Sequence, residues 1–167
     1  MVRLRKATPD DIPFMMATER LPGYEWFVGQ WDAARHLEVV NNSASAVLVG
    51  LDDAGVAQGF AILRELDEPS NNVYLQRIAI TRPGSGFGRA LLHAVTDFVF
   101  TELPTHRMWL LVKVHNAHAR YIYEATGFSQ EGRLRQAHIE PDGSRADSLM
   151  FSKLRSEWQP GRASATT

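Results

Sequence analysis

The sequence predicts a single α+β domain with a central mixed sheet of about seven strands flanked by about four helices. Its 167 residues suit one compact hydrophobic core. Segments with the alternation of strands and segments with helical spacing follow one another along the chain, and no linker, repeat or low-complexity block separates them. We expect residues 1–157 to form this domain and residues 158–167 to be a frayed tail.

Local patterns define the elements in order. Val2 and Leu4 alternate with basic residues as in a short strand, and Thr8-Pro9 is typical of a helix start. The expected elements are a strand at 2–4, a helix at 8–16, a helix at 31–40, strands at 46–51, 56–66 and 73–80 in an antiparallel meander, a helix at 88–103, a buried central strand at 108–114, a helix at 117–126 and a hairpin of strands 128–139 and 145–154.

The composition excludes several classes of protein. Eighteen Lys and Arg residues against nineteen Asp and Glu residues give a net charge of -1, so no basic excess favours nucleic acid or an anionic membrane as partner. No apolar run approaches the roughly 20 residues of a membrane-spanning helix. The absence of cysteine excludes disulfides, a thiol nucleophile and thiolate metal sites, and we expect no bound metal. Because no apolar secretory signal follows the first residues, we expect a cytoplasmic protein.

A glycine-rich loop joins an expected strand directly to an expected helix. The strand ends with Ile78, Ala79 and Ile80, and the loop then places Gly84, Gly86 and Gly88 at alternate positions. Backbone N–H groups without side chains around them, at the positive end of a helix, suit a pyrophosphate. No Gly-Lys-Ser/Thr follows, and an arginine replaces the third glycine of a dinucleotide fingerprint, which disfavours ATP and NAD. The competing interpretation is a turn that binds nothing.

A second segment places Asn116 and Tyr123 on one helix. Asn116 is a good N-cap, and Tyr123 follows two turns later, hence near the same face. One groove could therefore be lined by both side chains. Taken separately, each also has an ordinary structural interpretation, as a cap and as a packed aromatic ring.

Together, these two segments resemble the GCN5-related N-acetyltransferase (GNAT) superfamily. Residues 82–92 are similar to its acetyl-CoA loop and following helix, and residues 116–128 to its Asn-x-x-Ala…Tyr-Glu-x-x-Gly-Phe segment. The resemblance implies a GNAT fold and direct attack of an amine on the thioester of acetyl-CoA, with Tyr123 as the general acid that protonates the leaving thiolate. It also implies that the strands carrying residues 78–80 and 110–114 splay apart. The implied cofactor-binding residues are Ile78, Ala79, Ile80, Gly84, Ser85, Gly86, Phe87, Gly88, Arg89 and Asn116.

Several points stay open at this stage. Pro83 stands where the family loop usually has Arg or Gln, so Arg82 is the substitute we consider. The general base is Glu65, His115, His138 or water. The acceptor is a small-molecule amine such as a polyamine, or a protein N-terminus, and the family resemblance is compatible with a homodimer. The alternatives are a non-catalytic acyl-CoA-binding sensor and a small interaction domain.

Overall fold

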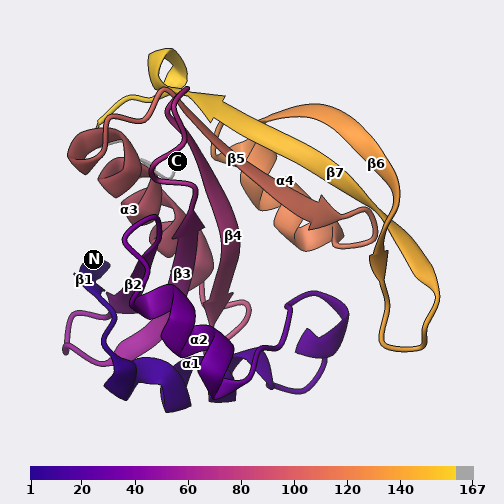
Figure 1. The fold of residues 1–167 in the computed structure, drawn as a ribbon, viewed down its shortest axis with the longest axis horizontal. Coiled ribbons are helices and arrows are strands. Elements are labelled where there is room, and N and C mark those ends of the chain that lie inside the picture. The colour runs from indigo at the N-terminus through magenta and orange to yellow at the C-terminus, as the bar shows by residue number, and fades with distance from the viewer. Residues whose placement is uncertain (161–167) are drawn as a thin grey trace.

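The computed structural model describes residues 1–160, which form one seven-stranded mixed sheet with the strand order β1-β2-β3-β4-β5-β7-β6 (Figure 1). All neighbouring strands are antiparallel except β4 and β5. The strands are β1 (Arg3–Lys6), β2 (Ala46–Leu51), β3 (Ala57–Arg64), β4 (Asn72–Ile80), β5 (Arg107–Lys113), β6 (Ser129–Ile139) and β7 (Arg145–Leu154). The α-helices are α1 (Ile12–Glu19), α2 (Ala33–Val40), α3 (Phe87–Glu102) and α4 (Ala117–Ala125). The α+β class and the order of elements are therefore confirmed.

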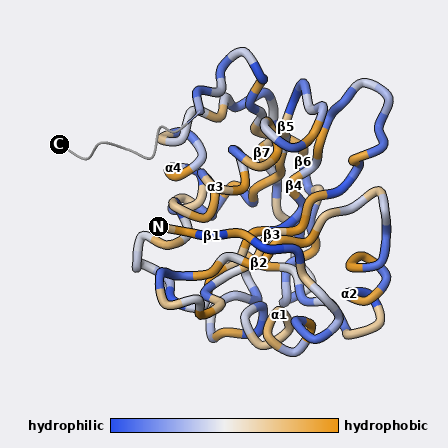
Figure 2. The backbone as a smooth tube through the Cα atoms, turned by 90° about the vertical axis from the view of Figure 1, so that its left-hand side faces the viewer, coloured by the Kyte–Doolittle hydropathy of each residue, from blue (hydrophilic) through white to orange (hydrophobic). Residues whose placement is uncertain are grey.

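The helices cover the sheet on both sides. Figure 2 shows the strands between α1 and α2 on one face and α3 and α4 on the other. Two buried clusters fill these two layers, one under α1 and α2 and a larger one under α3 and α4. Burial of these apolar side chains is the main force that holds the helices against the sheet.

Strands β4 and β5 form a wedge. They pair only at their beginnings, from Asn72 opposite Arg107 to Tyr74 opposite Trp109. Beyond this vertex they diverge, and the gap between their carboxyl ends is plain in Figure 1. The rings of Tyr74 and Trp109 stack across the vertex at a centroid distance of 4.1 Å. The expected splaying of these two strands is thus confirmed.

A bulge in β4 changes which face its side chains reach. The register between β3 and β4 shifts at Ile62/Leu63, so that one residue of β4, Gln76, is left without a partner. Leu75, before the bulge, packs in the α3 layer, whereas Ala79, after it, packs in the α1–α2 layer. Without the extra residue, both positions would face the same side, because strand side chains alternate.

Several boundaries differ from expectation, among them that of the first helix, which runs from Ile12 to Glu19 after a 3-10 turn at Pro9–Asp11. The second helix begins at Ala33 because Asp32 caps it, its side chain accepting from the N–H of Arg35 at 2.8 Å. Strand β3 ends at Arg64 because Glu65 has a left-handed backbone (φ 65°). Trp158 was expected in a frayed tail, but its indole N–H donates to Asp97 at 2.7 Å. Residues 161–167 of the expected tail lie outside the described part of the chain.

Within residues 1–160, none of the helices has both the length and the apolar character needed to cross a membrane.

Candidate active site

The glycine loop closes into a turn immediately before α3. The N–H of Ser85 donates to the carbonyl of Arg82, and Gly84 and Gly86 adopt φ values of 79° and 78°, which favour glycine. Gly86 is the N-cap of α3. Within the described residues, the N–H groups of Gly86, Gly88 and Arg89 have no acceptor. The loop therefore presents free donors at the positive end of a 16-residue helix.

The β4 wall of the wedge also offers free backbone groups. Thr81 pairs with Gln58 of β3, so the alternation of antiparallel pairing points the N–H and C=O of Ile78 and Ile80 into the gap. The hydroxyl of Tyr24 donates to the Ile80 carbonyl at 2.7 Å from that side. By the same alternation Ala79 uses its backbone on β3, and its side chain is buried. Ala79 is thus not placed for the backbone contact that the resemblance implied.

Tyr123 lies in the aromatic core under α4, on the α4 side of the vertex of the wedge. Its ring packs against Phe128 and Phe151, each at a centroid distance of 6.0 Å. Burial raises the pKa of Tyr123 to about 12, and the nearby hydroxyl of Tyr74 adds to this. The phenol is consequently neutral at physiological pH and close to Tyr74, which marks the vertex.

The two remaining polar residues of the predicted cofactor site are engaged within the fold. Asn116 caps α4 through a hydrogen bond from the N–H of Ala119 at 3.2 Å, as its position in the sequence predicts. Arg89 reaches across to α4 and donates to the carbonyl of Ala125 at 3.4 Å. Arg82 is exposed at the turn.

The candidate bases lie in two different places. Glu65 lies near Tyr74. The pKa of Tyr74 is raised mainly by burial and, to a smaller extent, by the negative charge of Glu65. His115 instead lies beyond the carboxyl end of β5, where its Nε2 is 2.8 Å from Glu140. His138 belongs to the same cluster, where burial and the charge of Lys113 lower its pKa. Only Glu65 of the three is thus near the vertex.

The loop between α1 and α2 spans the open end of the wedge. On one side Tyr24 holds the Ile80 carbonyl of β4, and on the other the ring of Phe27 packs on His115 at a centroid distance of 5.6 Å. The aromatic run around Trp26 indicated a pocket wall or a core plug in the sequence, and the structure places Trp26 and Phe27 partly exposed. The loop is therefore a wall of the wedge.

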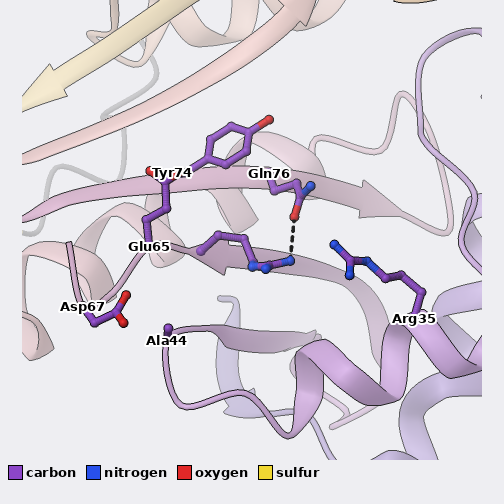
Figure 3. A pocket seen from close by; sticks show the side chains of 7 residues that line it. Arg35, Ala44, Glu65, Asp67, Tyr74 and Gln76 are labelled. Atoms are coloured by element: carbon purple, nitrogen blue, oxygen red, sulfur yellow. Dashed lines mark hydrogen bonds between the residues drawn. The ribbon is translucent and has the colours of Figure 1, made fainter.

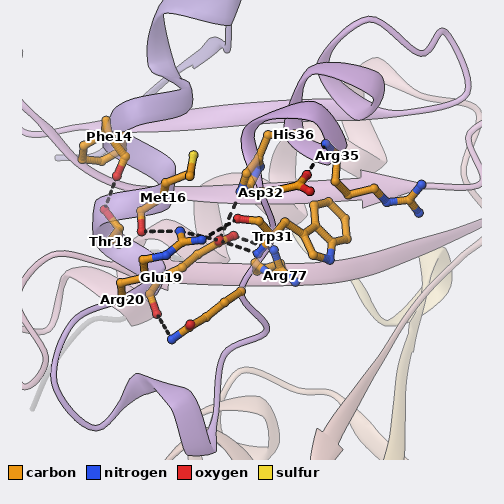
Figure 4. A network of polar contacts seen from close by, with 11 residues as sticks. Phe14, Met16, Thr18, Glu19, Arg20, Trp31, Asp32, Arg35, His36 and Arg77 are labelled. Carbon is orange, nitrogen blue, oxygen red and sulfur yellow. Dashed lines mark hydrogen bonds and ion pairs between the residues drawn. The ribbon is translucent and has the colours of Figure 1, made fainter.

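A buried ionic network fastens this loop to β4 (Figure 4). Glu19, at the end of α1, is fully buried; it accepts from Arg77 of β4 at 2.5 Å and lies 3.1 Å from Nε2 of His36. It also accepts from the N–H of Trp31, whose ring lies 4.1 Å from the Arg77 guanidinium carbon. Burial opposes ionisation of Glu19, but His36 and Arg77 outweigh it and lower its pKa. No local pattern in the sequence indicated this network.

On the α2 side of the vertex lies an open pocket of about 310 Å³ (Figure 3). Its lining carries two carboxylates and two guanidinium groups, a combination that the sequence did not connect. The lining residues are Arg35, Ala44, Arg64, Glu65, Asp67, Tyr74 and Gln76.

Comparison with known proteins agrees with this geometry. The model of the acetyltransferase (GNAT) family matches residues 13–128, and the chain therefore belongs to that family. Acetyl-CoA is the acetyl donor of GNAT acetyltransferases. In solved structures, a chimera of spermidine N-acetyltransferase SpeG from Vibrio cholerae and hSSAT superposes with a TM-score of 0.83 at 26% identity, covering 93% of this chain and 96% of that one.

Two curated relatives are similar over shorter segments. Spermidine N(1)-acetyltransferase of Vibrio cholerae is 42% identical over 57 residues, which is 34% of this chain and 33% of the relative. A [ribosomal protein bS18]-alanine N-acetyltransferase of Haemophilus influenzae is 34% identical over 97 residues, 56% of this chain and 62% of the relative. The matched segments thus span between a third and about two thirds of the lengths of these relatives.

Proposed function

We propose that the protein is an acetyl-CoA-dependent N-acetyltransferase that acts on a primary amine. The observation that carries this proposal is the wedge between β4 and β5, with the amide-rich mouth of α3 at its open end and Tyr123 behind its vertex. The strand from Ile80 back to Tyr74 covers roughly 20 Å at about 3.3 Å per residue. An extended arm between a diphosphate and a thioester fits such a length.

The residues present fit this cofactor. The free N–H groups of Gly86, Gly88 and Arg89 would hold the diphosphate, and the backbone of Ile78 and the N–H of Ile80 would hold the pantetheine arm as a partial extra strand. When bound, acetyl-CoA supplies the activated acetyl group. Because Arg89 lies 3.4 Å from the Ala125 carbonyl, it would have to leave that weak contact to add its charge to the diphosphate.

Tyr123 is proposed as the proton donor to the departing thiolate. Its raised pKa keeps the phenol protonated at neutral pH, so the proton is available. A cysteine-like thiol has a pKa of about 8.5, so the phenolate left behind is the stronger base and recovers a proton from solvent. Glu65, next to Tyr74, is the proposed acceptor of the amine proton, directly or through water.

The acceptor class follows from chemistry and from the relatives. Direct attack requires a neutral primary amine that reaches the vertex, which a small-molecule amine, including a polyamine, or a protein N-terminus provides. The similar proteins described above are named for spermidine and for the alanine of a ribosomal protein. Both kinds of acceptor therefore belong in the assays.

The test is Tyr123→Phe, which keeps the ring and removes the proton. We expect turnover to fall by about 10²- to 10⁴-fold in an assay of thiol release with a panel of amines. The rise in melting temperature with acetyl-CoA should be kept, because the free backbone donors are untouched. Tyr121→Phe is the matched control, since Tyr121 lies on the same helix with 65% of its surface exposed.

An unchanged rate in Tyr123→Phe would remove this residue from the mechanism. Binding of acetyl-CoA without thiol release for any amine would favour the acyl-CoA sensor instead. Failure of acetyl-CoA to raise the melting temperature would contradict both functions and leave the glycine loop as a simple turn.

A further inference from the structure

The pocket on the α2 side of the vertex is built by a change of direction at the end of β3. Consecutive strand residues point to opposite faces, yet Arg64 and Glu65 both line this pocket. The left-handed backbone of Glu65 accounts for this, and a residue other than glycine or asparagine rarely adopts it. The N–H of Leu66 then donates to the carbonyl of Ala44 at 3.0 Å, and this bond connects the end of β3 to the segment that follows α2.

The pocket adjoins the vertex of the wedge, where the proposed function would place the acetyl group. Tyr74 lines the pocket and also stacks on Trp109 at the vertex. Its hydroxyl lies close enough to Tyr123 to contribute to the raised pKa of that residue. Gln76, the bulge residue, precedes the free backbone of Ile78 by two positions. An acceptor in this pocket would therefore approach the thioester from the face opposite α4.

The charges of the pocket are largely uncompensated. Within residues 1–160, Arg64 has no carboxylate partner and donates only to the side-chain oxygen of Gln76 at 3.4 Å. Neither Glu65 nor Asp67 forms an ion pair in the same part of the chain. Arg35 forms an ion pair with Glu38, a half-exposed residue at the surface of α2. Charges of both signs thus line one cavity without neutralising one another.

The two signs lie at opposite ends. Figure 3 shows Arg35 reaching in from α2 on the side of Gln76, whereas Glu65 and Asp67 lie at the other end, near Tyr74. An ammonium or amine suits the carboxylate end, beside Tyr74. A planar guanidinium without a carboxylate partner among the described residues, as in Arg64, suits a carboxylate, which it can bind with two parallel hydrogen bonds.

We propose that this pocket is the acceptor site and that the acceptor is an amine that also carries a carboxylate, such as a free amino acid. The proposal rests on the proposed acetyltransferase function. A polyamine offers only cations, and these would meet the Arg64 and Arg35 guanidinium groups across a small cavity. The volume of about 310 Å³ is at the lower end of small-molecule sites and suits a compact acceptor.

The experiment uses acceptor pairs that differ only in the carboxylate: lysine against 1,5-diaminopentane, and ornithine against 1,4-diaminobutane. We expect the wild-type protein to acetylate the amino acid with a kcat/KM about tenfold or more higher than that of the diamine. In Arg64→Gln this ratio should fall toward one through a higher KM for the amino acid. Arg3→Gln, which removes an exposed arginine on the edge strand β1 that does not line the pocket, should keep the wild-type ratio.

A binding measurement separates this proposal from the one on which it rests. With coenzyme A present, the amino acid should raise the melting temperature more than the diamine does, and Arg64→Gln should remove that difference. If binding shows this preference but no acceptor is acetylated, the proposed reaction fails and the assignment of the pocket holds. Equal or stronger binding of the diamines, or a preference unchanged in Arg64→Gln, overturns the assignment of the pocket even if acetylation is observed.

Discussion

Two groups of charged side chains lie on the same face of the sheet, under α1 and α2, and differ in how their charges are compensated. In the first, Glu19 is fully buried and each of its oxygens has a partner, the Arg77 guanidinium on one and the His36 ring on the other. In the second, Arg64 and Glu65 line an open pocket and have no ion-pair partner within residues 1–160. The same residue types thus hold the fold in one place and remain free to bind in the other.

This difference indicates that the charges of the first group contribute to the stability of the fold, whereas those of the second contribute to ligand binding. Removal of the partner of a buried charge lowers the free energy of unfolding, because the remaining charge stays desolvated. A charge at an open pocket remains hydrated when its neighbour is removed, so the fold changes little and only ligand binding is affected. Stability measurements can therefore sharpen or break this comparison.

The largest effect is expected for Glu19→Ala. This change leaves the Arg77 guanidinium buried without a carboxylate, and we expect a loss of about 3–5 kcal/mol in the free energy of unfolding, measured by urea denaturation. Glu38→Ala is the control, because it breaks the exposed pair with Arg35 and should cost less than about 1 kcal/mol. Similar losses in both variants would show that burial does not distinguish the two pairs.

An intermediate effect is expected for Gly29→Ala, which overpacks the same network. A Cβ atom on Gly29 would lie 2.4 Å from a terminal nitrogen of Arg77, whose side chain is buried and cannot move aside freely. We expect a loss of about 1–3 kcal/mol in urea denaturation. Gly132→Ala, where a Cβ would meet nothing within 4 Å, is the matched control. If Gly29→Ala is as stable as its control, the packing of the network is looser than the structure indicates.

The smallest effect on stability is expected for Arg64→Gln. Because Arg64 makes only a long hydrogen bond to Gln76, its loss should change the free energy of unfolding by no more than about 0.5 kcal/mol. Circular dichroism during urea denaturation measures this. A loss comparable to that of Glu19→Ala would show that Arg64 stabilises the fold, as Glu19 does, and is not kept free for ligand binding.

The sequence predicted much of the fold and part of the site. The glycine turn before α3, the Asn116 cap and the wedge are where the sequence and the family resemblance place them, because caps and glycine conformations depend on a few neighbouring residues. The sequence left three bases open, and only the structure separates Glu65, beside Tyr74, from His115, which lies with Glu140.

The sequence by itself determined the order of the elements, the donor-rich mouth of α3 and the position of Tyr123 on α4, since each follows from patterns within one or two helical turns. Only the tertiary structure decided which charges meet. A single extra residue in β4 sends Arg77 to Glu19, and a left-handed Glu65 turns its carboxylate into the pocket. Both depend on strand register and backbone direction, which bring together residues 58 positions apart in the chain and leave no local trace in it.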